Sequence, residues 1–256
     1  MDTAVTAVAA ALKDAHRRGV TADASRPDAA ALQTLAQAGA VHWALGRELD
    51  WWATPVPRVW KAGAPDAASP VTCAPLPDNG IWDSPADARD WPMGMRGVEA
   101  EIALRLGQAV SAEQAARLTP DAVHALVDAM AVSIELVDSR WRQAMDAPDL
   151  LRLADLQSHG ALVLGAWQSY RRLDWQAQAC EVRCGDAAVV RRQGSHSLSD
   201  PVAVLLPWLQ QATAQCGEIP AGTVVTTGTW VGLLHARPGD LVQVAFAGIG
   251  QASVQL

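Results

Sequence analysis

The chain has 256 residues, of which 50% are hydrophobic and 18% are charged, and this balance excludes an intrinsically disordered protein. Its formal net charge of −7 argues against nucleic acid or an anionic membrane as a partner. No apolar run approaches the roughly 18 to 20 residues that a membrane-spanning helix needs. Residues 1–13 carry no basic segment ahead of their apolar stretch, so we expect no signal peptide and a cytoplasmic protein.

The cysteines and tryptophans bear on how the core is built. A chain of this length can bury a core without disulfides, so we expect free thiols at Cys73, Cys180, Cys184 and Cys216. Most of the eleven tryptophans are expected to lie in the core or at subunit contacts. Trp60 and Trp230 adjoin motif residues and are candidates for the wall of a pocket.

The N-terminal third predicts helices followed by irregular structure. Residues 1–13 have the apolar spacing of an amphipathic helix. A second helix is predicted from Asp28 to about Leu49, with Pro27 suited to its first turn. The stretch 55–92 is rich in Pro, Ala, Asp and Gly, which indicates short strands joined by loops and a candidate lid or pocket rim.

Residues 97–106 alternate apolar residues with two glutamates and predict a β-strand. Val98 and every second residue after it would face a core, whereas Glu99 and Glu101 would share the other face. Carboxylates at this spacing lie roughly 6 to 7 Å apart at their Cβ atoms, so both can reach one hard cation. Glutamates are also ordinary on the solvated face of a strand, so this pair alone does not require a metal.

A third acid follows in the next predicted elements. Thr119 as N-cap and Pro120 in the first helical position predict a helix that continues to Met130. A second alternating strand is predicted over 131–140, where Glu135 would be an isolated acid on a small or apolar face. Such an acid is costly unless it meets solvent, a cation or a basic partner.

Three acids on two strands suit Mg²⁺ or Mn²⁺, which prefer oxygen ligands. We therefore take a divalent-metal site as the first hypothesis. Asp138 competes with Glu135 for the third position, because a bulge in the strand would change which acid points inward. His and Cys residues nowhere have the spacing of a zinc site.

The C-terminal part predicts one more helix among short strands. Asp200 and Pro201 begin a helix that ends at Gly217, with a kink at Pro207. Turns at 184–186 and 238–240 separate strand runs, and the second turn precedes a strand over 241–246. Helices and strands are segregated and do not alternate as regular βαβ units, so the predicted fold class is α+β.

Six motifs occur in one order over most of the chain: Val59-Trp60-Lys61-Ala62-Gly63, Gly97-Val98-Glu99-Ala100-Glu101-Ile102-Ala103, Ile134-Glu135-Leu136-Val137-Asp138-Ser139-Arg140, Leu153-Ala154-Asp155 with Ser158, Gly222-Thr223-Val224-Val225-Thr226-Thr227-Gly228-Thr229, and Pro238-Gly239-Asp240 through Gly248-Ile249-Gly250. Together they resemble the fumarylacetoacetate hydrolase superfamily, in its 2-keto-4-pentenoate hydratase and 2-oxo-3-hexenedioate decarboxylase branch. The resemblance implies one unit over residues 1–256, with a mainly helical part over 1–60 and a mixed β-roll over 61–256 that holds the site.

The resemblance also implies roles for individual residues. Glu99, Glu101 and Glu135 would bind Mg²⁺ or Mn²⁺, and the carboxylate and the neighbouring 2-oxo or enol oxygen of a substrate would complete the coordination. Lys61 would be the acid/base or electrostatic group, either with a lowered pKa or charged against a substrate carboxylate; the chain's other lysine is Lys13. Contacts with the substrate would come from Asp155, Ser158, Thr227, Gly228 and Thr229.

The implied activity is hydration of 2-hydroxypenta-2,4-dienoate or a related 2-oxo acid. The alternatives are decarboxylation of 2-oxo-3-hexenedioate, C–C hydrolysis of an acylpyruvate, and a non-catalytic partner subunit of such an enzyme. Glu135 stands five residues before Arg140, which favours the hydratase branch over the hydrolase branch. A homo-oligomer is also expected from the family resemblance.

The chain departs from the family's pattern in two places, and one family residue has only a candidate here. Leu156 stands where the family commonly has an asparagine, and this loss keeps the non-catalytic alternative open. The loop after Lys61 is unusual, with Ala64-Pro65-Asp66. For the family's acidic pocket residue, Asp78 is only a candidate.

Overall fold

The structure is a computed structural model that describes residues 2–26 and 32–256. Its α-helices are α1 (Thr3–Arg18), α2 (Leu35–Glu48), α3 (Ala112–Arg117), α4 (Asp149–Ala154) and α5 (Leu205–Cys216). Its strands are β1 (Val59–Gly63), β2 (Thr72–Pro75), β3 (Ile81–Asp83), β4 (Ala86–Asp87), β5 (Gly97–Leu106), β6 (Val110–Ser111), β7 (Val127–Val137), β8 (His159–Leu164), β9 (Gln168–Ser169), β10 (Ala179–Cys184), β11 (Val190–Gln193), β12 (Glu218–Ile219), β13 (Val224–Thr226), β14 (Leu234–His235), β15 (Leu241–Phe246) and β16 (Gly250–Gln255).

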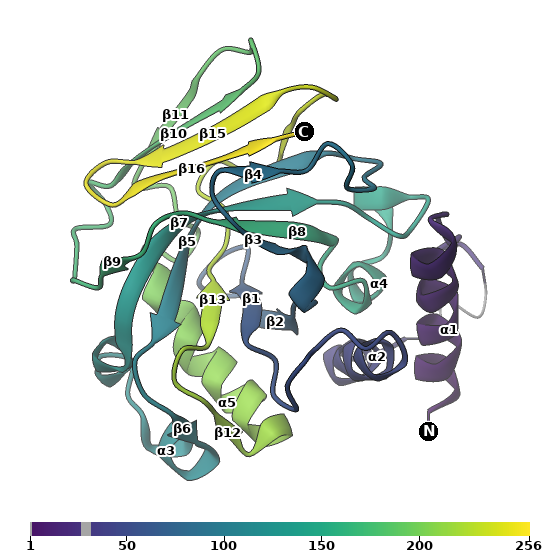
Figure 1. Ribbon diagram of the computed structural model, residues 1–256. Helices are drawn as coiled ribbons and strands as arrows, with labels where there is room; N and C mark the ends of the chain where they lie inside the picture. The colour runs from purple at the N-terminus through teal and green to yellow at the C-terminus, as the bar shows by residue number, and fades with distance from the viewer. Residues whose placement is uncertain (1, 27–31) are drawn as a thin grey trace.

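The main sheet curls around the two long strands β5 and β7. Its strand order is β2-β1-β13-β5-β7-β8-β3, with β14 added to β5 and β9 added to β7. Figure 1 shows β5 and β7 as strongly curved strands, with α5 below them and the N-terminal helices α1 and α2 at the right edge of the molecule. The fold is therefore α+β with N-terminal helices and a curled half-barrel sheet, which confirms the predicted class.

The two faces of β5 differ as the alternation predicts. Val98, Ala100, Ile102, Leu104 and Leu106 are all 2% exposed or less and belong to the main core, together with side chains of α5. The opposite face, which we call the site face, carries Glu99 and Glu101. Antiparallel pairing with β7 places Glu135 directly across from Glu99 on this same face.

A second sheet, in the order β11-β10-β15-β16-β4, covers the main core. Val182, Val244 and Phe246 turn inward from it, while Glu181 and Gln243 of the same strands stay exposed. Cys180 and Cys184 share the buried face of β10, and all four cysteines are free thiols. The prediction for the cysteines is thus confirmed.

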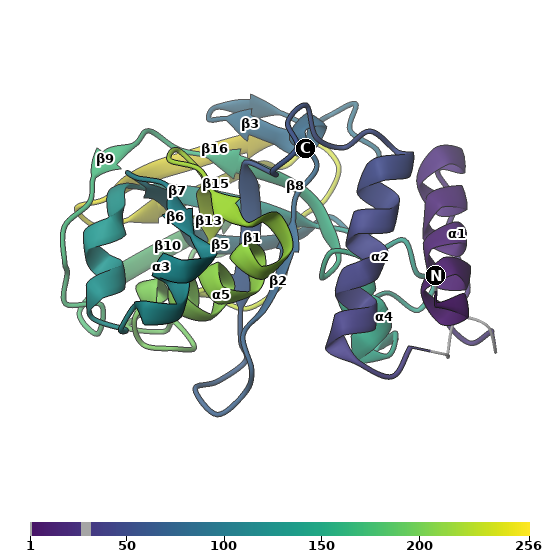
Figure 2. The ribbon, with the colours of Figure 1, turned by 90° about the horizontal axis from the view of Figure 1, so that it is seen from below.

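The helices α1, α2 and α4 pack into an apolar cluster of their own (Figure 2), which includes Leu12, Val41, Leu45, Trp141 and Leu151. Asp2 caps α1, and a capping box of Thr34 and Gln37 begins α2. The predicted start of this second helix at Pro27 and Asp28 lies outside the described residues. None of the helices in the described part of the chain is long and apolar enough to cross a membrane.

The prediction of a helix from Thr119 to Met130 is wrong. A short 3-10 turn, Ala122–Leu126, is followed at once by β7. Each of the residues Ala129, Met130 and Ala131 is paired with β5, and β9 pairs with the first two of them. Sheet pairing thus outweighs the local capping pattern. A segment buried on both faces gains more stability from hydrogen bonds and packing between strands than from one helical turn.

Two further differences concern helix ends. Ser111 and Gln114 form a capping box for α3, a helix that the sequence analysis missed although the Ser-x-x-Gln pattern is visible. Asp200 caps a 3-10 turn, Pro201–Val204, and α5 follows directly. Gly217 is the C-cap of α5, as predicted. Pro207 is the third residue of α5, so it lies in a first turn and not in the middle of a continuous helix.

Candidate metal centre and active site

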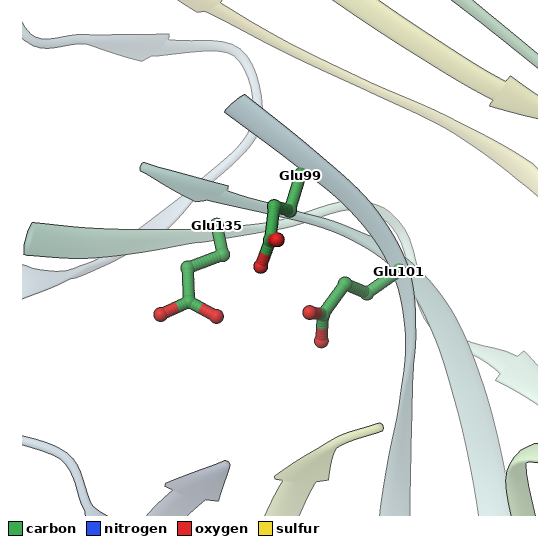
Figure 3. A group of neighbouring side chains, drawn as sticks. All are labelled: Glu99, Glu101 and Glu135. Carbon is green, nitrogen blue, oxygen red and sulfur yellow. The ribbon is translucent and has the colours of Figure 1, made fainter. Parts of the chain in front are cut away.

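Three glutamates converge on the site face. Glu99 and Glu101 reach from β5 and Glu135 from β7, and Figure 3 shows the three carboxylates turned toward a common space. Each offers an oxygen atom, and these oxygens all lie within 4.8 Å of one another. Glu135 is 0% exposed and Glu101 is 2% exposed, whereas Glu99 is half-buried.

Strand register brings Lys61 to the same place. Lys61 of β1 pairs in parallel with Thr226 of β13, and Thr226 pairs with Ala103 of β5. Partners in register share a face, so Lys61, Thr226 and Glu101 lie on the site face. Trp60, one residue earlier, points to the opposite face and packs against Trp208 of α5.

Lys61 forms a buried ion pair with Glu135. Its Nζ lies 2.5 Å from Oε1 of Glu135 and 3.3 Å from the main-chain oxygen of Gln157. Burial opposes the charged form of Lys61, but Glu135, Glu99 and Glu101 outweigh it and raise the lysine pKa above its ordinary value. Of the two states expected for Lys61, this arrangement favours the charged ammonium.

His159 is the second partner of Glu135. Its Nδ1 lies 3.0 Å from the same Oε1, while Oε2 of Glu135 is buried and has no hydrogen-bond partner among the described residues. Burial works against ionisation of Glu135, yet Lys61 and His159 together hold its pKa below the ordinary range. Burial lowers the pKa of His159 itself, so its imidazole is neutral.

At Glu99 and Glu101 the charge of Lys61 favours ionisation but does not offset burial. Burial, followed by the charge of Glu135, raises the pKa of Glu101 to about 7 and that of Glu99 to about 8. Glu101 accepts hydrogen bonds at Oε2 from the Thr226 hydroxyl and from the Gly228 amide, the latter at 2.9 Å. Ser133, opposite Glu101 on β7, completes a chain of hydroxyls by bonding to Thr226 at 3.0 Å.

This donor set fits a divalent cation. Three carboxylates face one lysine, so the fully ionised cluster carries an excess of negative charge in a buried place. The unpartnered Oε2 of Glu135 is an acceptor that the described residues leave unused. All three donors are hard oxygens, as Mg²⁺ and Mn²⁺ prefer, and Glu99, Glu101 and Glu135 would hold such an ion.

A strained turn adjoins the site. Leu156, Gln157 and Ser158 all have positive φ, between 51° and 58°, which costs a non-glycine residue roughly 1–2 kcal/mol. The turn presents the Gln157 carbonyl to Lys61, and the Gln157 side chain donates to the Thr72 hydroxyl at 2.5 Å. Ser158 Oγ is buried with no partner among the described residues.

Arg140 and Asp155 hold this turn in place. The Asp155 carboxylate accepts hydrogen bonds from Nε of Arg140 at 2.5 Å, from its amide at 2.9 Å and from Ser139 at 3.2 Å. The same guanidinium donates to the main-chain oxygens of Asp155 and His159, which flank the turn. Asp155 thus bonds to protein groups with both carboxylate oxygens.

The predicted substrate-contact residues fall into two groups. Thr227 donates its hydroxyl to the Ile102 carbonyl and is 0% exposed, and the Thr229 hydroxyl donates to the Gly232 carbonyl at 3.1 Å. Gly228 and Thr229 are half-buried, with Gly228 at a φ of 101° that only glycine adopts readily. The substrate contacts of Asp155, Ser158, Thr227, Gly228 and Thr229 remain predictions.

Four other candidates lie apart from the cluster. Asp138 accepts from the amides of Gly94 and Met95, at 3.0 and 2.7 Å, and is not among the three acids that converge. Asp78 is exposed and accepts from the Ala53 amide at 2.8 Å. Trp60 and Trp230 are each 1% exposed in the main core, so they pack the core and do not wall an open pocket.

Three residues of the site were missed by the sequence analysis: Thr226, Gln157 and His159. Thr226 could have been found by alternation, because it lies two positions from Val224 in a strand that carries the threonine-glycine motif. Gln157 acts through its backbone carbonyl, which sequence patterns do not reveal. His159 follows Ser158 directly, but its orientation depends on a register shift in the pairing of β7 with β8.

The chain is similar to known proteins over most of its length. The sequence profile described as Fumarylacetoacetate (FAA) hydrolase C-terminal matches residues 34–256. A 2-keto-4-pentenoate hydratase 2 of Dechloromonas aromatica (strain RCB) is 33% identical over 159 residues, which are 61% of this chain and 58% of that protein. A 4-oxalocrotonate decarboxylase of Pseudomonas sp is 27% identical over 157 residues, or 61% of this chain and 59% of the relative. These matches span less than two thirds of the curated relatives.

A solved structure resembles the whole chain. The 4-oxalocrotonate decarboxylase from Pseudomonas putida G7, complexed with magnesium and adipate, superposes with a TM-score of 0.83. The superposition covers 98% of this chain and 96% of that one at 20% sequence identity. At this identity the likeness demonstrates a shared fold.

Proposed function

Because the chain belongs to the fumarylacetoacetate hydrolase family, we propose that it is a metal-dependent enzyme of the hydratase and decarboxylase branch. Within that branch we propose a hydratase that adds water to 2-hydroxypenta-2,4-dienoate (2-keto-4-pentenoate) or a related 2-oxo acid. The observation that carries the proposal is the convergence of three carboxylates beside a buried, charged lysine.

The proposed roles follow from the contacts. Glu99, Glu101 and Glu135 hold Mg²⁺ or Mn²⁺. When bound, the cation supplies stabilisation of the negative charge that develops on the substrate's 2-oxo or enol oxygen. Hydration moves a proton from the enol oxygen to carbon before water adds at C4, and Lys61 holds a proton at Nζ close to the three acids. Lys61 is therefore the proposed acid/base residue.

The remaining site residues would bind and orient the substrate. Ser158 Oγ is a buried polar atom without a protein partner, which suits contact with a polar ligand. Gly228 and Thr229 are half-buried next to Glu101, where a substrate carboxylate could approach the backbone. Asp155 and Thr227 already bond to Arg140 and Ile102, so we propose that they act by holding the shape of the site.

Two comparisons bear on the choice between hydration and decarboxylation. The higher identity to a hydratase favours hydration. The whole-chain likeness in fold to a decarboxylase makes 2-oxo-3-hexenedioate the second candidate substrate. A cation held by the three glutamates would supply stabilisation of enolate charge in either reaction. Hydration forms a C–O bond at C4, whereas decarboxylation breaks the C–C bond to the departing carboxylate.

Ultraviolet-monitored turnover tests the proposal. 2-Hydroxypenta-2,4-dienoate, 2-oxo-3-hexenedioate and an acylpyruvate are each incubated with the protein in Mg²⁺, in Mn²⁺ and in chelator. We expect metal-dependent loss of the 2-hydroxypenta-2,4-dienoate chromophore, faster than that of the other two. Preferential loss of 2-oxo-3-hexenedioate would assign a decarboxylase, and no turnover of any substrate would contradict the proposed activity.

A pair of variants ties the activity to the metal centre. Glu101→Gln keeps the shape of the side chain but removes a charge from the cluster, and we expect it to abolish metal-dependent turnover. Glu113→Gln is the matched control, because Glu113 pairs with Arg117 on the surface of α3. Unchanged turnover in Glu101→Gln would refute the ligand assignment.

A further inference from the structure

His159 stands out because it contacts a proposed metal ligand without belonging to the acidic cluster. It is the first residue of β8, and it is 3% exposed. An ionised carboxylate only accepts hydrogen bonds, so the contact with Glu135 requires the proton on Nδ1. Nε2 is then the unprotonated nitrogen, and it has no partner among the described residues.

The two oxygens of Glu135 have different surroundings. Oε1 receives both Lys61 at 2.5 Å and His159 at 3.0 Å, which fills its two lone-pair directions. Oε2 is equally buried and receives no hydrogen bond from the described residues. The carboxylate therefore has one oxygen bound to protein and one left for a ligand.

The backbone leaves the imidazole little freedom. The register shift between Leu136 and Val137 sets His159 opposite Val137, two residues from Glu135 and on the same face of β7. Arg140 donates to the main-chain oxygens of Asp155 and His159, on both sides of the left-handed turn. The main chain thus holds the backbone of His159 in place, and the contact of Nδ1 with Glu135 orients the ring.

We propose that His159 is a positioning residue that, with Lys61, occupies Oε1 of Glu135 and makes Glu135 a monodentate ligand through Oε2. This inference rests on the metal centre of the proposed function. Mg²⁺ demands near-octahedral geometry, whereas Ca²⁺ accepts bidentate carboxylates. By occupying Oε1, His159 favours Mg²⁺ over Ca²⁺ at this centre.

An isosteric pair of variants tests the proposal. In His159→Asn the amide nitrogen replaces Nδ1 as donor, whereas His159→Leu keeps a similar shape without a donor. We titrate Mg²⁺ and Ca²⁺ into metal-depleted protein by calorimetry. We expect His159→Asn to bind both ions nearly as the wild type does, and His159→Leu to lose about 10–100-fold in Mg²⁺ affinity. The loss of Ca²⁺ affinity should be smaller, so the Mg²⁺/Ca²⁺ ratio falls.

Equal losses in both variants, or unchanged Mg²⁺ affinity in His159→Leu, would overturn the role of His159. Absence of Mg²⁺ binding in the wild type would overturn the metal centre instead, which keeps the two failures distinct. If circular dichroism shows that His159→Leu does not fold, His159→Gln replaces it, because its amide lies one bond too far out to take the Nδ1 position. Nitrogen-15 shifts of the wild-type imidazole give an independent check: a proton on Nε2 and not on Nδ1 would also overturn the proposal.

Discussion

The ion pair of Lys61 with Glu135 and that of Arg140 with Asp155 share a nitrogen–oxygen distance of 2.5 Å and similarly low exposure. They differ in how completely the carboxylate is hydrogen-bonded. Both oxygens of Asp155 accept hydrogen bonds from Arg140 or Ser139. Glu135 accepts two hydrogen bonds at one oxygen and, from the described residues, none at the other.

This difference separates a structural pair from the pair that we propose to act in the reaction. A buried carboxylate whose two oxygens both accept hydrogen bonds can fix the backbone around it, as Asp155 does with Arg140 for the left-handed turn. A buried charge with an unused acceptor, next to two more carboxylates, costs folding free energy unless a ligand supplies the missing partner. The two pairs should therefore respond differently to the loss of their cationic residue.

The largest expected effect is on activity. Lys61→Met removes the proposed proton-carrying group while keeping its length, and kcat/KM should fall about 10²–10⁴-fold in the turnover assay with Mg²⁺. The free energy of unfolding should change much less, because Glu135 can take up a proton or bind the cation more closely. Lys13→Met is the control, since Lys13 pairs with Glu48 near the surface of the N-terminal helices. A loss smaller than about tenfold would exclude Lys61 from proton transfer.

Arg140→Met should show the opposite profile. Its removal leaves Asp155 buried without its main partner, and the free energy of unfolding should fall by about 3–5 kcal/mol in urea denaturation. Arg142→Met is the matched control two residues away, because its pair with Asp23 is exposed and should contribute less than about 1 kcal/mol. Similar stability losses in the two variants would show that the buried pair of Arg140 and Asp155 does not stabilise the fold more than an exposed pair does.

The third prediction concerns the uncompensated acids. The folded-state pKa of Glu99, about 8, lies above its ordinary value of 4.5, so ionisation increasingly destabilises the fold as pH rises through this range. Glu99→Gln removes the cost, and metal-free Glu99→Gln should be roughly 1–3 kcal/mol more stable than metal-free wild type at pH 8.

The gain should shrink toward pH 5, where the Glu99 carboxyl is protonated in the folded protein. Saturating Mg²⁺ should reverse the order, because only the wild type binds the ion tightly. Thermal unfolding at pH 5 and pH 8, with and without Mg²⁺, measures these differences. Exposed Glu113→Gln should change little in any condition, and a wild type more stable than Glu99→Gln in chelator at pH 8 would contradict the prediction.

Much of the site could be predicted because strand alternation fixes faces. Glu99 and Glu101 share a face by period, and Glu135 was placed by the same rule on a second strand. That the two strands are adjacent and in register could not follow from alternation, because it depends on long-range pairing. The family resemblance supplied that connection by bringing Lys61 and the three acids into one site.

The elements that were missed depend on tertiary contacts. The stretch predicted as a helix from Thr119 to Met130 has a good local start, but its second half pairs with β5 and β9. No local preference favours three successive non-glycine residues at positive φ, so the turn at 156–158 is held by Arg140 from another part of the chain. His159 follows that turn directly, and its Nδ1 contacts Glu135.

The smallest expected effect concerns two adjacent threonines, Thr226 and Thr227. One contacts a proposed metal ligand, and the other makes a structural contact. The Thr226 hydroxyl donates to Glu101, whereas the Thr227 hydroxyl donates to the Ile102 carbonyl at 2.8 Å. Thr226→Val removes a donor that favours the ionised carboxylate, so the pKa of Glu101 should rise above its present value of about 7.

More of the metal-free variant is then protonated at pH 7, and Mg²⁺ must displace that proton. We expect Mg²⁺ affinity measured by calorimetry to fall about tenfold or less at pH 7, and to approach the wild-type value at pH 9, where both proteins are ionised. Thr227→Val should instead lose about 1 kcal/mol of stability and keep its Mg²⁺ affinity. The two substitutions are the same chemical change at neighbouring positions, and the lost hydroxyls differ in their acceptors, Glu101 and the Ile102 carbonyl. Equal weakening of Mg²⁺ binding at pH 7 in both variants would therefore show that the Thr226 hydroxyl has no specific effect on the metal centre.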